Sequence, residues 1–174
     1  NTFQNPDARA ATLYQTLLGA WPIHVDRVSA FVTKAVREGG LPIGLGFVYG
    51  LFHGVLPEPS AGLRRRMFGV SDLRVVQEMV RRAAVNHCGS PAGLNNRAIF
   101  PGLADLEGLP PVHLLNADRD LLRASAENFA HRLTLAGVPH EGWYLHGTTH
   151  GFLARPEKPP FAVGMRAIVG WLAG

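Results

Sequence analysis

The chain is poor in cysteine, in charge and in long apolar runs. Its single cysteine, Cys88, excludes an internal disulfide and fits a reducing, cytoplasmic compartment. No apolar run approaches the roughly 20 residues that a membrane-spanning helix needs. Charged residues make up 17% and hydrophobic residues 47% of the 174 residues. This composition predicts a globular chain with a sizeable core rather than a disordered one.

Patterns that bind metals, nucleotides or nucleic acids are also missing. No His-Glu-x-x-His occurs, and His87-Cys88 has no further ligands at zinc spacing, so no metal is expected. The glycines of Gly44–Phe52 lie inside an apolar run rather than between a strand and a helix, so we expect no cofactor. The net charge is +4, with one small basic cluster at 64–66 and no interleaved aromatics. A solvated surface explains this cluster better than a nucleic-acid site.

Strand-like and helix-like segments alternate along the chain. Continuous apolar runs typical of buried parallel strands are followed by amphipathic stretches with helical spacing. The alternation predicts an α/β fold with a parallel sheet covered by helices on both faces. Expected strands are Gly44–Phe52, Val112–Asn116 and Trp143–Leu145; expected helices are Ala8–Trp21, Ser29–Glu38, Asp72–Asn86 after an N-cap at Ser71, Arg123–Ala136 and Phe161–Ala173; residues 54–66 and 88–108 are expected to be irregular.

An acid and a base follow the last two strands. Asp120 comes after the strand Val112–Asn116, and His150 comes after the strand at Trp143–Leu145. Because sites in parallel sheets lie at the carboxyl ends of the strands, we expect both side chains at one rim. A carboxylate there can accept the imidazole Nδ1–H and leave Nε2 to take a proton from a nucleophile. Asp118 competes with Asp120 for this role but is better explained as a turn former.

We expect no catalytic role for the other histidines named here. They are most simply structural or exposed, and they are His24, His53, His113, His131 and His140.

The segments around this acid and base resemble a known family. The stretches Leu109–Val112, Ala117–Arg123, Phe129–Leu133, Ala136–Pro139 and His146–Phe152 closely resemble the carboxyl-terminal third of hormone-sensitive-lipase-like carboxylesterases, with a fainter likeness back to Gly44. The resemblance implies an α/β-hydrolase fold, with Asp120 as the triad acid and His150 as the triad base. Acid before base is also the order of these residues in α/β-hydrolases.

The nucleophile is where the sequence departs from that family. The family's Gly-Asp-Ser-Ala-Gly-Gly turn has no counterpart, and neither does its His-Gly-Gly-type oxyanion segment. Ser29 is the best nucleophile candidate because Ser29-Ala30 keeps part of the motif, yet Arg27 and Phe31 are too large for the strained turn. Ser29 therefore also reads as a helix N-cap. Ser71 is a second candidate, but no strand precedes it.

The resemblance implies hydrolysis of small carboxylic esters through an acyl-enzyme. The alternative is a non-catalytic member of the same fold that binds a ligand or a protein.

We expect residues 1–174 to form a single α/β-hydrolase-like domain that is incomplete: the chain begins at Asn1, and residues are expected to be missing between about Arg27 and Val32. We also expect a homodimer through the edge strand at Trp143–Leu145 and the helix Phe161–Ala173, because edge strands invite pairing and the resembled family commonly pairs there.

Overall fold

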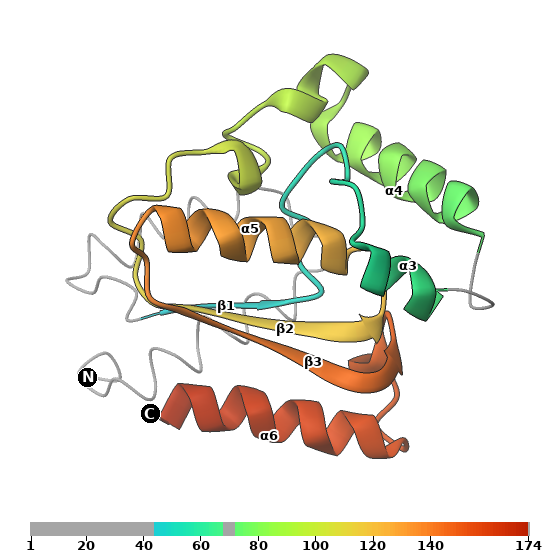
Figure 1. Cartoon of the computed structure of the whole chain (residues 1–174), viewed down its shortest axis with the longest axis vertical. Coiled ribbons are helices and arrows are strands. Elements are labelled where there is room, and N and C mark those ends of the chain that lie inside the picture. Colours follow the sequence, from blue (N-terminus) through green and yellow to red (C-terminus); the bar gives the residue numbers. More distant parts are fainter. Residues whose placement is uncertain (1–43, 68–71, 174) are drawn as a thin grey trace.

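In the part of the chain that the structure describes, a three-stranded parallel sheet lies between two layers of helices (Figure 1). The computed structural model describes residues 44–67 and 72–173. Its strands are β1 (Leu45–Val48), β2 (Val112–Arg119) and β3 (His140–Thr149), in the order β1-β2-β3. Phe47 of β1 pairs with Leu114 of β2, which pairs in turn with Gly142 of β3. The predicted parallel α/β sheet is therefore confirmed.

The strands β2 and β3 are longer than the sequence predicted, and β1 is shorter. β1 ends at Val48, whereas the apolar run continues to Phe52. β2 extends past Asn116 to Arg119, so Asp118 lies within a strand; its predicted role as a turn former is wrong. The buried Asp118 carboxylate is paired on several sides, which makes a strand position tolerable for a charged residue. β3 is an edge strand of the described sheet, as expected.

Helices cover both faces of the sheet. α5 (Arg123–Leu135) packs on one face, on the same side as α3 (Ala61–Met67) and α4 (Leu73–Cys88), whereas α6 (Pro159–Ala173) covers the other (Figure 1). Short 3-10 turns connect these elements at Pro91–Asn95, Pro101–Leu103 and Phe152–Ala154. The helices predicted near 72–86, 123–136 and 161–173 are confirmed, with shifts of one to a few residues at their ends.

Two local predictions are corrected near α3 and α4. Residues 61–67 form the helix α3, although prolines and glycines upstream suggested an irregular segment. Its Leu63 and Met67 are buried, so tertiary packing stabilises a helix too short to form alone. The N-cap of α4 is Asp72, not Ser71, because the Asp72 side chain accepts a hydrogen bond of 2.9 Å from Arg74 N. The predicted helices 8–21 and 29–38 lie outside the described residues, as does the window 27–32, and the single-domain interpretation stays a prediction.

The core is split by β2, whose successive side chains point to opposite faces. Leu114 packs under α5 with Phe52 and Phe129, whose rings stack at 4.1 Å between centroids. Leu115 packs on the other face with residues of α6 such as Ile168. The sheet is thereby clamped between two apolar layers, which holds the carboxyl ends of β2 and β3 in fixed positions for the side chains that follow them.

Candidate active site

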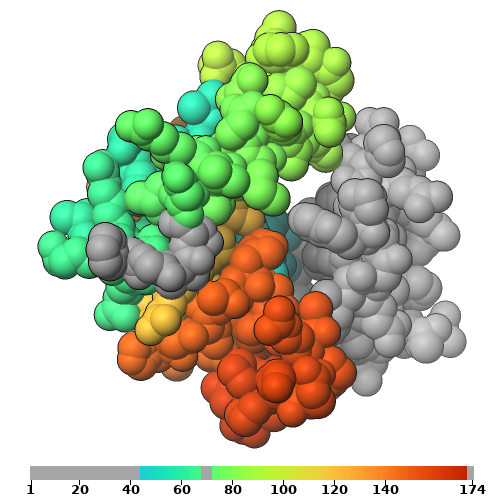
Figure 2. All heavy atoms as spheres, turned by 90° about the vertical axis from the view of Figure 1, so that its right-hand side faces the viewer, coloured from blue at the N-terminus to red at the C-terminus, as the bar shows by residue number. Residues whose placement is uncertain are grey.

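The carboxyl ends of β2 and β3 bring an acid and a base together. Asp120 follows β2, His150 follows β3, and His150 Nδ1 lies 2.7 Å from Asp120 Oδ2. The sequence predicted this contact from the positions of the two residues, and the contact is confirmed. Figure 2 faces this side of the molecule, where the orange surface of the segment around the end of β3 lies close to the green surface of α3 and α4.

Asp120 is held in one orientation by contacts to both of its carboxylate oxygens. Its side chain is buried, and its Oδ1 accepts a hydrogen bond of 3.0 Å from Leu122 N at the start of the turn into α5. Its Oδ2 is thus the oxygen presented to His150. Since the two carboxylate oxygens serve different partners, the carboxylate cannot rotate freely, and the imidazole it holds is oriented as well.

His150 is placed to exchange protons with a bound molecule. The imidazole is about half exposed, with 53% of the side-chain surface accessible. The hydrogen bond to Asp120 raises the pKa of His150 above its ordinary value, and this effect outweighs burial, which lowers the pKa. When Nδ1–H donates to Asp120, Nε2 is the nitrogen that can accept a proton. An imidazole oriented in this way can act as a general base and then as a general acid.

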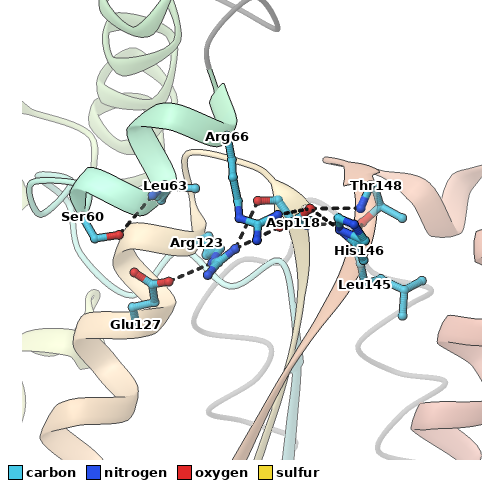
Figure 3. Close-up of polar contacts among 10 residues, drawn as sticks. Ser60, Leu63, Arg66, Asp118, Arg123, Glu127, Leu145, His146 and Thr148 are labelled. Atoms are coloured by element: carbon cyan, nitrogen blue, oxygen red, sulfur yellow. Dashed lines mark hydrogen bonds and ion pairs between the residues drawn. The ribbon is translucent and has the colours of Figure 1, made fainter.

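Asp118 is the centre of a second charged cluster, two residues before Asp120 (Figure 3). Its Oδ2 lies 3.0 Å from Arg66 Nη1, from His146 Nδ1 and from Gly147 N, while Oδ1 lies 3.2 Å from Arg123 Nη1. Only 4% of its side chain is exposed. The carboxylate therefore links β2 to α3, to α5 and to the end of β3 that leads to His150.

The charge of Asp118 is stabilised by these partners. Burial alone would raise the pKa of Asp118, but the hydrogen bond from Gly147 N and the charges of Arg66, His146 and Arg123 together lower it below its ordinary value. Arg123 is itself fixed by Glu127, 2.8 Å away, and by the Tyr144 ring, whose centroid lies 3.7 Å from the guanidinium carbon. This cluster could not be predicted from the sequence, because its members come from four separate elements with no shared motif.

The predicted nucleophile cannot be placed. Ser29 and Ser71 both lie outside the described residues. Ser125, by contrast, contacts a histidine: its Oγ lies 2.9 Å from His53 Nδ1 and accepts a hydrogen bond from Phe52 N. Ser125 has no exposed surface, so a substrate cannot reach it, and the pair is a buried structural one. Burial is also the main reason why the pKa of His53 is lowered.

The remaining histidines of the described residues show no catalytic arrangement. His113 is buried beneath the Trp171 ring and contacts Glu141 Oε1 at 2.9 Å. His131 is exposed on α5. Within residues 44–67 and 72–173, no three histidine, cysteine, aspartate or glutamate side chains gather as metal ligands would. In the same residues, no helix is long and apolar enough to cross a membrane.

The parallel sheet with helices on both faces, and with Asp120 and His150 together at one rim, is part of an α/β-hydrolase fold. The sequence pattern of the family described as "alpha/beta hydrolase fold" matches residues 29–154, and the chain belongs to that family. The resemblance to hormone-sensitive-lipase-like carboxylesterases is thus confirmed at the level of family and fold.

Known proteins that resemble the chain are esterases and a lipase. A 65-residue stretch, 37% of this chain, is 37% identical to an arylesterase of Saccharolobus solfataricus and spans 21% of that protein. A hormone-sensitive lipase from a metagenome library superposes with a TM-score of 0.65 at 23% identity, over 84% of this chain and 49% of the other. A carboxyl esterase of Tuber melanosporum gives a TM-score of 0.63 at 22% identity, over 85% and 50%. The chain thus spans about half the length of the solved structures it resembles.

Proposed function

We propose that the protein hydrolyses small carboxylic esters through an acyl-enzyme. The observation that carries the proposal is the 2.7 Å contact between His150 Nδ1 and Asp120 Oδ2, at the rim where α/β sheets place their sites. Family membership and the arylesterase relative support the same reaction class. A cytoplasmic location and the absence of a cofactor are part of the proposal, on the sequence arguments given above.

In the proposed mechanism, a serine hydroxyl attacks the ester carbonyl while His150 Nε2 takes the serine proton. His150 then passes this proton to the leaving alcohol, and the acyl group stays on the serine. A water molecule, deprotonated by the same nitrogen, releases the carboxylic acid and returns the proton to the serine. Asp120 stabilises the imidazolium that forms in both half-reactions, and backbone N–H groups hold the oxyanion. Ser29 is the proposed nucleophile on the sequence evidence alone.

A fluorophosphonate probe followed by peptide mass spectrometry tests the nucleophile and the base together. We expect the label on Ser29, and its loss in the Ser29→Ala and His150→Ala variants, because the hydroxyl needs the imidazole to react. Turnover of a short aryl ester should fall by about 10³-fold or more in His150→Ala. His131→Ala is the matched control, since His131 is exposed on α5, and it should leave both readouts unchanged. A label that persists in His150→Ala would remove His150 from the mechanism.

A second candidate function is a binding module of the same fold without a nucleophile. The missing Gly-x-Ser-x-Gly turn favours it. Under this alternative, the probe labels no serine, and the His150→Ala variant hydrolyses the ester no more slowly than the parent. The two candidates therefore give opposite results in one experiment.

We further propose that the protein forms a homodimer through β3 and α6. Trp143 and Tyr144 on the edge strand are 54% and 46% exposed, and Val163 and Val169 on α6 are 42% and 57% exposed. An edge strand with unpaired backbone groups beside apolar side chains favours association. Light scattering should give twice the chain mass, and Trp143→Lys should reduce this to one chain mass. A monomer at high concentration in the parent protein would contradict the proposal.

A further inference from the structure

Tyr49, directly after β1, has a backbone conformation that is costly for its residue type. Its φ is 53°, and it is the one non-glycine residue with positive φ in the described parts of the chain. A residue with a Cβ rarely adopts a positive φ. Residues that do so are held in that conformation by surrounding contacts and often lie at functional sites. The Tyr49 N–H donates a 3.0 Å hydrogen bond to Leu115 O, so the strained backbone stays attached to β2.

The side chain of Tyr49 reaches from β1 to the segment that carries His150. Its ring centroid lies 5.0 Å from that of the His150 imidazole and 5.1 Å from that of Phe152. Its hydroxyl accepts a 2.7 Å hydrogen bond from Leu153 N. Tyr49 therefore contacts the ring of His150, the ring of Phe152 and the backbone of Leu153.

The segment needs such support because it turns sharply at the histidine. Gly151 has a φ of 77°, a conformation that favours glycine, and it leads into the 3-10 turn Phe152–Ala154. The first N–H groups of a helical turn have no partner within the turn, and the Tyr49 hydroxyl accepts from one of them. Asp120 holds the imidazole at Nδ1, while Tyr49 contacts its ring and ties down the backbone that follows it.

We propose that Tyr49 is a positioning residue for His150: it fixes the His150–Leu153 segment so that the imidazole stays against Asp120. This inference deepens the proposed function, and it rests on that function only for its consequence in catalysis. It predicts that the Tyr49 hydroxyl, which accepts from Leu153 N, also controls the contact between His150 Nδ1 and Asp120.

The test is a titration of the histidine Cε1–H signals by NMR in the parent, in Tyr49→Phe and in Tyr144→Phe. The His150 signal is assigned by its absence in His150→Gln. Tyr49→Phe keeps the ring and the charge and removes only the hydroxyl, so a looser contact with Asp120 should lower the pKa of His150. The amide of Leu153 should exchange faster with solvent. Tyr144→Phe, which removes a hydroxyl on the edge strand, should change neither quantity.

A purely structural Tyr49 would give a different result. It would lower the melting temperature in Tyr49→Phe and speed the exchange of Leu153, whose N–H loses its acceptor in either case, but leave the pKa of His150 as in the parent, which would overturn the proposal. If Tyr49→Phe fails to fold, nuclear Overhauser contacts between the Tyr49 ring and the His150 ring protons in the parent decide instead: their presence supports the proposal, and their absence overturns it.

These readouts require no ester turnover, so the inference and the proposed function can fail separately. Absence of serine labelling in the parent, together with a lowered pKa of His150 in Tyr49→Phe, would reject the hydrolase and keep the positioning role. Where turnover is measurable, Tyr49→Phe should lower kcat with little change in KM, and the acid limb of the pH profile should shift to lower pH with the pKa of His150.

Discussion

The substitution Asp118→Asn tests whether the buried charge cluster stabilises the fold. The asparagine keeps the volume of the side chain, and its carbonyl oxygen can still accept from Gly147 N. It loses the negative charge that Arg66, Arg123 and His146 face at 3.0–3.2 Å. Its NH₂ group also meets one of these donors, so at least one hydrogen bond is lost.

The expected cost follows from the exposure of each partner. Removing one member of a buried ion pair costs about 3–5 kcal/mol when the other member is left without a partner. Here the Arg66 side chain is 48% exposed and regains water, and Arg123 keeps Glu127 as a partner. We therefore expect the free energy of unfolding at pH 7 to fall by about 2–3 kcal/mol, the range of one or two charge-assisted hydrogen bonds.

The same substitution has a predicted pH dependence. The folded-state pKa of Asp118 lies below its ordinary value of about 3.9, so the ionised carboxylate stabilises the fold above that value. This contribution is lost as the pH falls through the lowered folded-state pKa. The difference between the parent and Asp118→Asn should therefore be largest at neutral pH and should shrink in acid.

Urea denaturation of both proteins, followed by circular dichroism across this pH range, gives the measurement. Asp105→Asn is the matched control, because Asp105 is exposed and its amide analogue can still accept from Glu107 N. It should change the free energy of unfolding by less than about 0.5 kcal/mol. Equal stability of the parent and Asp118→Asn at pH 7, or a difference that grows as the pH falls, would refute the reasoning.

Two further pairs of substitutions test the packing that supports the site. Phe129→Ala should lower the free energy of unfolding by about 3–5 kcal/mol, since the stacked ring is 1% exposed; Leu135→Ala, 75% exposed on the same helix, should cost less than about 0.5 kcal/mol. Gly102→Ala should cost about 1–3 kcal/mol by chemical denaturation, because its Cβ would lie 2.5 Å from the Phe52 carbonyl oxygen. Gly170→Ala, with no described atom within 4 Å of the added Cβ, should instead stabilise α6 by up to about 1 kcal/mol; an equal cost for both glycines would contradict the packing argument.

Much of the sheet could be predicted because its signals are local. Continuous apolar runs marked β1 and β2, and helical spacing marked α5 and α6, so the parallel order followed from chain topology. Helix α3 could not be predicted, because its stability comes from burying Leu63 and Met67 against residues far along the chain. The end of β2 could not be predicted for a related reason. An aspartate such as Asp118 is typical of a turn, and only its partners in the folded structure explain its place in a strand.

The contact between Asp120 and His150 could be predicted from the sequence, whereas the contacts that surround these two residues could not. Asp120 and His150 each follow a strand, and neighbouring parallel strands end at the same rim, so their contact was predictable. The contacts of Asp118 and Tyr49 could not be predicted. The donors around Asp118 come from α3, α5 and β3, and Tyr49 contacts a segment about a hundred positions away.

The sequence by itself determined the parallel α/β arrangement, the positions of the acid and base, and the resemblance to esterases. These depend on periodicity, on strand order and on short motifs, all of which can be read along the chain. The tertiary structure alone decided that Asp118 is a buried charged centre, that Tyr49 adopts a strained backbone against His150, and that Ser125 is buried out of reach. Such properties depend on which distant side chains meet and how much water they exclude, and no local pattern in the chain carries that information.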